Sequence, residues 1–222
     1  MNKLIQAIVI ASLLISSAAQ AVVIRGTGTV ALVGNDLTDP ENNGNPEANV
    51  GYNATFRSSV ENGFAGGEFA YNVFDNQVGG GNDKWCCDTN VWVEANFGTK
   101  RYALTSFTAA SANDEAGRDS DQWKILGSND GVNYTTIFDY NRDGVSPWAQ
   151  RLQVNQYKVG ADFASPAAYS IFRYQSTSVV DQPMHQLAEL EFFGTEVPEP
   201  GALALFALAL GGLAFSGRKK QK

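Results

Sequence analysis

Carboxylates are the most plentiful side chains in this sequence that could do chemistry. The 222 residues include 23 aspartates and glutamates but only one histidine, His185, and two cysteines. A lone histidine usually has a structural role, and no serine or cysteine nucleophile can be assigned to it. The sequence contains no G-x-S-x-G, H-E-x-x-H or phosphate-loop motif. These observations argue against catalysis, although carboxylates are numerous enough to supply the acid and base of a glycosidase.

The two cysteines are adjacent, at Cys86 and Cys87. In an oxidising compartment they could form a vicinal disulfide, stay as two thiols or bond to another chain. Neighbouring Cα atoms are ~3.8 Å apart, which is closer than the ~4.4–6.8 Å of most disulfides, so a vicinal ring is strained. Such strain tends to mark functional sites. Of the three states, we expect the vicinal disulfide. No Cys-x-x-Cys spacing or histidine accompanies the pair to indicate a metal site.

Short strands are the elements that must position these residues. Runs rich in Val, Tyr, Phe, Thr and Trp alternate with clusters of Gly, Asn and Asp, and no stretch between the two ends shows a sustained helical period. Strands are predicted at residues 27–33, 52–58, 91–96, 102–109, 123–127, 135–140, 151–159, 169–175 and 187–193. Many short strands with regular turns predict an all-β fold, either a sandwich or a jelly roll.

The first 21 residues have the three parts of a secretory signal peptide. Lys3 supplies the positive charge, residues 4–15 form an apolar run, and Ala19-Gln20-Ala21 is a small-x-small cleavage site. We therefore expect the mature chain to begin at Val22 and to work outside the cytoplasm.

The last 26 residues combine a Pro-Glu-Pro box (Pro198, Glu199 and Pro200), an apolar run over residues 202–215 and a basic end at Arg218-Lys219-Lys220. As a helix the apolar run is ~21 Å long, shorter than a hydrocarbon core of about 30 Å, and the basic end favours the cytoplasmic side. A hydrophobic membrane anchor is one interpretation. The segment resembles the PEP-CTERM protein-sorting tail.

That resemblance implies a partner and a location. A membrane-embedded exosortase would cut the tail near the box while the hydrophobic sorting helix transiently occupies the inner membrane. The protein would then be exported to the cell surface or extracellular matrix of a Gram-negative bacterium that secretes polysaccharide. Removal of residues 1–21 and 201–222 takes away five basic residues and no acidic ones, which leaves 11 basic and 23 acidic residues, a net charge of −12. This charge argues against nucleic acid and anionic lipid as partners and suits calcium and neutral polysaccharide.

Four groups of motifs between residues 51 and 196 resemble the discoidin, or coagulation-factor type C, domain. They are residues 72–75 followed by Lys84-Trp85, residues 91–93 leading to Phe97-Gly98, residues 123–131, and residues 172–174 with 187–194. The resemblance implies a β-sandwich jelly roll over residues 51–196. Residues 22–50 would add a strand and a polar loop to it, and residues 197–222 would form the sorting tail. Bacterial members of this family are mostly carbohydrate-binding modules, often with one structural calcium ion.

The family resemblance also implies a metal site. In such domains an aspartate in a turn and a glutamate in the closing strand share the calcium ion, and the matching residues are Asp75 and Glu189. Oxygen ligands of this kind suit calcium, and Asn82 and Asp83 could add more. The alternative is that these carboxylates are simply solvated.

The ligand site is expected in the segment after Trp85, because the matching residues of sugar-binding relatives often contact the ligand. Here this segment is Cys86, Cys87 and Asp88. A vicinal disulfide is a compact apolar ring that could pack against a sugar, with Asp88 forming hydrogen bonds to hydroxyl groups.

The tryptophans divide into core and surface candidates. Trp92 and Trp123 lie within predicted strands and are expected in the core. Trp148 follows a proline in a loop, near Arg151, and is expected to expose its ring to a ligand, with Arg151 as a further ligand-binding candidate. Trp85 could belong either to the core or to the ligand site.

Together these patterns favour a non-catalytic, exported surface or matrix protein that binds carbohydrate and associates with extracellular polysaccharide. A structural or adhesive spacer without glycan binding is one alternative. A small polysaccharide-active hydrolase is another.

Overall fold

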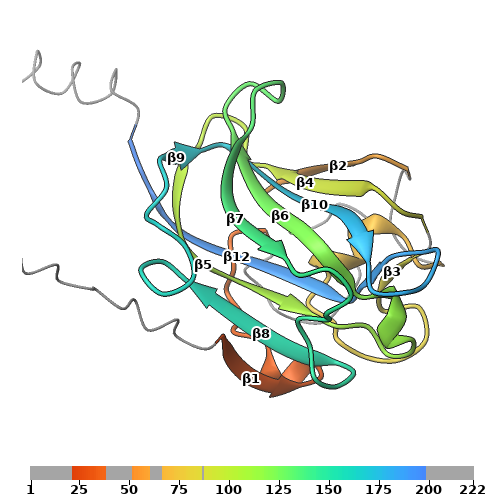
Figure 1. Cartoon of the computed structure of the whole chain (residues 1–222). Coiled ribbons are helices and arrows are strands. Elements are labelled where there is room, and N and C mark those ends of the chain that lie inside the picture. Colours follow the sequence, from red (N-terminus) through yellow and green to blue (C-terminus); the bar gives the residue numbers. More distant parts are fainter. Residues whose placement is uncertain (1–21, 39–51, 61–66, 87, 199–222) are drawn as a thin grey trace, which may run out of the picture.

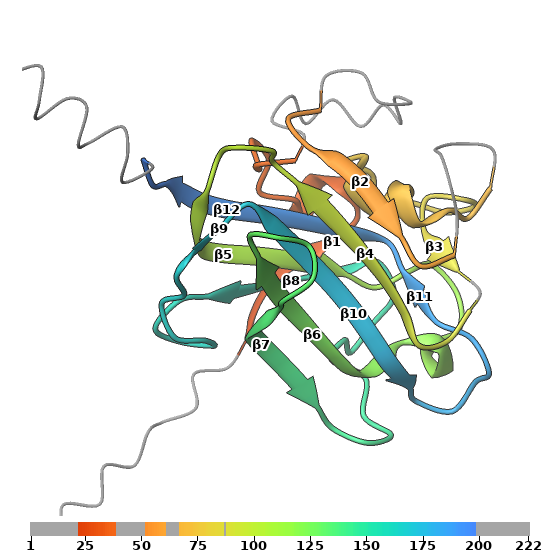
Figure 2. The same cartoon turned by 90° about the horizontal axis from the view of Figure 1, so that it is seen from above.

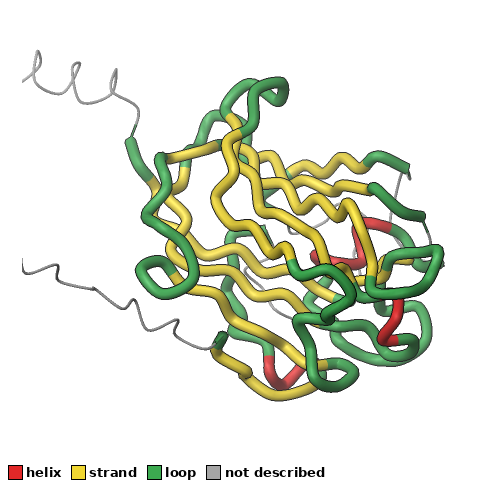
Figure 3. The backbone as a smooth tube through the Cα atoms, viewed as in Figure 1, coloured by secondary structure: helices red, strands yellow, loops and turns green. Residues whose placement is uncertain are grey.

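The computed structural model describes residues 22–38, 52–60, 67–86 and 88–198. The predicted signal peptide, the middle of the polar loop, Cys87 and the tail beyond Pro198 lie outside these ranges. The described residues form strands, loops and three short 3₁₀ helices, η1 (Thr29–Ala31), η2 (Ala70–Phe74) and η3 (Ala116–Arg118), as Figure 3 shows. None of the described helices is long and apolar enough to cross a membrane. The all-β prediction is confirmed.

Two antiparallel sheets face each other (Figure 1). The first sheet has the order β1-β8-β5-β12, and β9 also pairs with β5. Its strands are β1 (Val23–Thr27), β5 (Tyr102–Ala110), β8 (Gln153–Lys158), β9 (Ala168–Tyr169) and β12 (Glu189–Glu196).

The second sheet has the order β2-β4-β10-β6-β7 and lies toward the viewer in Figure 2. Its strands are β2 (Thr55–Ser58), β4 (Val91–Asn96), β6 (Ser120–Ser128), β7 (Thr135–Asn141) and β10 (Ile171–Val179). A separate two-stranded ribbon pairs β3 (Trp85–Cys86) with β11 (Gln186–Leu187) near one end of the sandwich.

Aromatic rings fill the space between the two sheets. Trp123 of the second sheet is fully buried and lies 6.1 Å from Phe107 and 5.6 Å from Tyr157 of the first, measured between ring centroids. The ring of Tyr174, on the neighbouring strand β10, lies 5.4 Å from that of Trp123. Buried aromatic side chains contribute large apolar areas and favour such edge-on and tilted contacts. Truncation of Trp123 to alanine would cost about 3–5 kcal/mol.

Most of the predicted strands overlap a strand of the structure, but several bounds differ. Strand β2 begins at Thr55 rather than at residue 52, residues 169–175 are divided between β9 and β10, and residues 187–193 between β11 and β12. The two-residue strand β3 was not predicted. Two of the differences have a backbone cause. Residues 27–33 are not a strand, because Gly28 has a φ angle of 73° and turns the chain into η1. The first strand therefore ends at Thr27, and Val30 is 96% exposed. Strand β8 begins at Gln153 rather than at residue 151, because Leu152 has a φ angle of 59° in the preceding turn.

A buried polar chain joins the ribbon to the second sheet. His185 is fully buried, with its ring centroid 4.6 Å from Trp85 and its Nε2 atom 3.4 Å from the Tyr174 hydroxyl. The Tyr174 hydroxyl donates to Ser120 Oγ at 2.7 Å, and Ser120 Oγ donates to Ser176 Oγ at 2.7 Å. Burial disfavours the imidazolium form and lowers the pKa of His185 from 6.5 to about 3.

Burial of His185 should therefore make stability depend on pH. Between pH 6.5 and about 3 only the unfolded chain takes up this proton, so the free energy of unfolding falls as the pH drops through that range. The His185→Gln variant cannot take up the proton. We expect the difference in unfolding free energy between wild type and variant to change by up to ~1.4 kcal/mol per pH unit. Urea unfolding at several pH values measures this difference, and parallel curves for the two proteins would contradict the assignment.

Candidate functional site

The segment after Trp85 offers little exposed surface to a ligand. Trp85 is fully buried and packs against His185, and Cys86 is buried. Cys87 lies outside the described residues, so the vicinal disulfide stays a prediction. Asp88 is exposed, and its backbone oxygen accepts a hydrogen bond from the amide of His185 at 2.9 Å. Of the described residues predicted here, only Asp88 is placed to meet a ligand.

The predicted surface position of Trp148 is wrong. Its side chain is in the core and 4% exposed, and its indole N–H donates to the carbonyl of Ala109 at 3.1 Å. Arg151 forms a two-point ion pair with the buried Asp119, in which Nη1 lies 2.8 Å from Oδ1. Ser146 also donates to this carboxylate. These contacts fix the loop between β7 and β8, so Trp148 and Arg151 have structural roles.

Trp92 was expected in the core and lies instead on the outer face of the second sheet. Successive side chains of a strand point to opposite faces, and Val91 and Val93 occupy the buried face of β4. The guanidinium of Arg173 covers the Trp92 ring, with its central carbon 3.9 Å from the ring centroid. The expectation that Trp123 lies in the core is confirmed.

Four buried carboxylates gather where β12 begins. Burial raises the pKa of Glu189 well above its usual value, and the charges of Asp75, Asp36 and Glu191 raise it further. The structure thus brings together Asp75 and Glu189, as expected, and adds two carboxylates that sequence reasoning missed. Asn82 and Asp83 are not in this group, because Asn82 is exposed and the pKa of Asp83 is raised by burial alone.

Glu191 and Glu189 differ in their hydrogen-bond partners. Glu191 accepts hydrogen bonds from the amides of Val33 and Gly34 at 3.0 and 2.6 Å and from the hydroxyl of Thr108 at 2.7 Å. Glu189 accepts one bond, at 3.2 Å, from the amide of Leu190, and its Oε2 atom is buried without a hydrogen-bond partner. Glu191 therefore has a structural role, whereas the environment of Glu189 suits a nearby cation.

Side chains alone do not complete a metal site. Over the described ranges, no group of three or more His, Cys, Asp or Glu side chains is arranged to hold one metal ion. A calcium ion takes six to eight oxygen ligands, and backbone carbonyls commonly supply several of them. The buried pair of Asp75 and Glu189 fits such a site only if backbone oxygens provide the remaining ligands.

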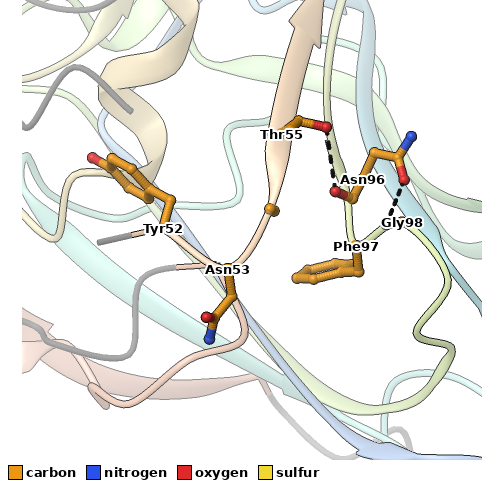
Figure 4. Close-up of a pocket in the computed structure, with 7 residues that line it drawn as sticks. Tyr52, Asn53, Thr55, Asn96, Phe97 and Gly98 are labelled. Atoms are coloured by element: carbon orange, nitrogen blue, oxygen red, sulfur yellow. Dashed lines mark hydrogen bonds between the residues drawn. The ribbon is translucent and has the colours of Figure 1, made fainter. Parts of the chain in front are cut away.

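A pocket of about 320 Å³ lies at the edge of the second sheet, away from the carboxylates at the start of β12 (Figure 4). It lies where β2 begins and β4 ends. Its lining residues come from two segments of the chain, Tyr52, Asn53, Ala54 and Thr55 from the first and Asn96, Phe97 and Gly98 from the second.

Strand pairing and local bonds hold the two sides of the pocket together. Thr55 is paired with Asn96 across β2 and β4, and the side-chain oxygen of Asn96 accepts a hydrogen bond from the amide of Gly98 at 2.9 Å. Gly98 has a φ angle of 67°, which glycine adopts readily. Phe97 is anchored in the core by Tyr102, with 5.1 Å between their ring centroids. The Phe97 and Asn96 side of the pocket is therefore built on rigid elements.

The lining has the composition of a site for an uncharged polar ligand. The lining residues include two aromatic side chains, Tyr52 and Phe97, the amides of Asn53 and Asn96 and the hydroxyl of Thr55. Phe97 is 6% exposed. No charged side chain belongs to this lining. Sequence reasoning missed the pocket because its two sides are about 40 residues apart in the chain, and only the register of β2 against β4 brings them together.

The start of the tail lies beside the same part of the fold. The amide of Val197 donates to the carbonyl of Arg101 at 2.8 Å, in the loop that joins Phe97 and Gly98 to β5. Residues 196–220 match the PEP-CTERM protein-sorting motif. No curated protein matches the chain in sequence.

Among solved structures the chain is similar to carbohydrate-binding modules. One is the family 32 module of Clostridium perfringens NanJ in complex with galactose, with 16% identity, 63% of this chain and 93% of that chain covered, and a TM-score of 0.47. The family 32 module of Streptococcus pneumoniae EndoD has 12% identity, 64% and 96% coverage, and a TM-score of 0.49. The family 62 module of Clostridium thermocellum Xyl5A has 20% identity, 60% and 87% coverage, and a TM-score of 0.44.

Proposed function

We propose that this chain is an exported, non-catalytic glycan-binding protein whose pocket between β2 and β4 holds one uncharged sugar unit. The observation that carries the proposal is the lining of that pocket, which combines aromatic rings with amide and hydroxyl groups. The apolar face of a sugar ring packs against aromatic side chains, and amides can donate to and accept from its hydroxyl groups. A volume of about 320 Å³ is at the small end of ligand pockets, which suits a short saccharide.

The chemistry of the pocket supports binding rather than hydrolysis. Glycoside hydrolysis requires two carboxyl groups that flank the scissile bond, and the pocket lining contains neither a carboxylate nor a histidine. The buried carboxylates around Glu189 belong to another part of the fold, at the opposite end of β12 from Val197. The hydrolase alternative therefore has no support from this pocket. If no glycan binds to the protein, the alternative of a structural or adhesive spacer would remain.

The sorting motif gives the proposed function a location. Its match over residues 196–220 indicates export and a bacterial surface or secreted protein. We propose further that an exosortase removes the tail and that the glycan is part of the extracellular polysaccharide of a Gram-negative producer. A protein that binds one unit of a repeating polysaccharide would be held in the matrix after the tail is cut.

We also propose that one calcium ion stabilises the fold, held by Asp75 and Glu189 together with backbone oxygens. The support is the unpartnered Oε2 atom of Glu189 and the other carboxylates whose charges act on it. A divalent cation would offset the repulsion that these buried charges otherwise exert on one another.

Sugar binding in the pocket can be tested by changing one exposed residue of its lining, Asn53. The Asn53→Ala change removes one amide from the pocket, and we expect at least about tenfold weaker binding to oligosaccharides from the producer's own polysaccharide, equivalent to ~1.4 kcal/mol. Calorimetry measures the affinity. The Asp88→Ala variant is the matched control, because Asp88 is exposed in the segment predicted from sequence. Weakened binding in Asp88→Ala with unchanged binding in Asn53→Ala would place the site after Trp85 instead.

Calcium should raise the melting temperature of the wild-type protein. At a calcium concentration 100 times the dissociation constant, the expected gain is about 2.7 kcal/mol, or about 5–10 °C for a domain of this size. The Glu189→Gln change should abolish this response and leave the calcium-free protein at least as stable, because a neutral amide relieves the repulsion. Glu196→Gln, at the far end of the same strand, should keep the response. A wild-type protein that is indifferent to calcium and to chelators would refute the site.

Processing at both ends should be visible in the intact mass of the exported protein. We expect the mature chain to begin at Val22 and to end near Pro198–Gly201, because the signal peptide and the sorting tail are both removed. Mass spectrometry of protein purified from the producer's culture measures both ends. Recovery of exported protein that still carries Arg218–Lys222 would contradict removal of the tail.

A further inference from the structure

The outer face of the second sheet carries a group of residues that none of the roles above uses. We call it the arginine cluster, and it consists of Arg57 on β2, Trp92 and Glu94 on β4, Arg173 on β10, and Tyr134 just before β7. Figure 2 looks toward the sheet that carries it. Arg57 and Arg173 are both paired with Glu94 in the strand register, from either side of β4.

Glu94 lies at the centre of the arginine cluster and is completely buried, although it is on the outer face. Its Oε1 atom accepts from Arg57, with 2.7 Å to Nε and 2.5 Å to Nη2. Its Oε2 atom accepts from Arg173, with 2.9 Å to Nε and 2.7 Å to Nη2, and from the Tyr134 hydroxyl at 2.6 Å. The carboxylate is therefore fully occupied by cluster members.

Arg173 is held rigidly between two aromatic rings. Its guanidinium carbon lies 3.9 Å from the ring centroid of Trp92 and 3.9 Å from that of Tyr134. Burial and the hydrogen bond to Glu94 raise the pKa of Tyr134 to about 12, so the phenol stays neutral and keeps donating. These contacts cover Arg173, whose side chain is only 13% exposed.

Arg57 is the exposed member of the arginine cluster. Its side chain is 59% exposed, and only the Nε and Nη2 edge of its guanidinium faces Glu94. Two guanidinium groups share one carboxylate, so the cluster keeps a net charge of about +1 on a strongly acidic body. A guanidinium that is oriented on one edge can still form two parallel hydrogen bonds to a carboxylate from its other edge.

The pocket and the arginine cluster are neighbours on one face. Thr55 and Asn96 line the pocket and are paired with each other, and Arg57 and Glu94 are the next pair along the same strands on the same side. Two residues of a strand span about 6.6 Å. A saccharide chain that leaves the pocket along β2 and β4 therefore passes over Arg57 within a unit or so.

We propose that Arg57 binds the carboxylate of an acidic sugar that neighbours the unit held in the pocket, so that the glycan is a carboxylate-bearing polysaccharide. This inference rests on the proposed function of the pocket and specifies its ligand. Glu94 acts as a positioning residue, because it holds one edge of the Arg57 guanidinium. Arg173 supplies the second positive charge of the cluster. The planar carboxylate matches the planar guanidinium edge, which makes a uronic-acid type of sugar the fitting class.

The test compares the producer's polysaccharide with its carboxyl-reduced form, in which each carboxylate has become a hydroxymethyl group. We expect the wild-type protein to bind the native form about tenfold or more tightly than the reduced form. Arg57→Gln should lose this preference and still bind the reduced form as the wild type does, which also shows that the variant is folded. Lys124→Gln is the matched control, because Lys124 is on the second sheet but pairs with Asp139 at 3.1 Å, away from the pocket. It should keep the preference.

The possible failures are distinguishable. If neither form binds to the wild type, the proposed function of the pocket fails, and this inference fails with it. If both forms bind equally, or if the native glycan contains no carboxylate, the pocket survives and the role of Arg57 is overturned. Equal loss of preference in Arg57→Gln and Lys124→Gln would show a general effect of charge and would also overturn it.

Discussion

The packing of aromatic rings between two antiparallel sheets is the constraint on which the rest of this structure depends. Trp123 contacts rings from both sheets and is completely buried. Because side chains alternate along a strand, placing Trp123 and Val93 inside also decides what lies outside. The outer face of β4 then presents Trp92, Glu94 and Asn96 in a row. The arginine cluster and one side of the pocket are therefore consequences of how the core is filled.

The sequence predicts the fold well, because strand alternation and turn residues are local signals. The predicted bounds of β4 are correct, and the first strand is misplaced because Gly28 turns the chain into η1. The tryptophans show the limit of such reasoning. Trp92 alternates with Val91 and Val93, so its outer position could have been read from the pattern. Nothing local indicates that the ring of Trp148, after a proline in a polar loop, enters the core.

The candidate sites were harder to predict, because they depend on contacts between distant segments. Asp75 and Glu189 were paired only through a family resemblance, and Asp36 and Glu191 join them because the chain before β2 crosses the start of β12. The pocket requires the register of Thr55 against Asn96, which no local pattern specifies. The loop beside the pocket also contacts Val197, where the sorting motif starts.

A crystal structure of the exported protein with an oligosaccharide from the producer's polysaccharide would show whether the pocket between β2 and β4 holds a sugar unit. We expect electron density for a sugar ring against Tyr52 and Phe97, within hydrogen-bond distance of Asn53 or Asn96, with the neighbouring unit over Arg57. A saccharide bound in the segment around Asp88, with an empty pocket, would show that the pocket is not the binding site.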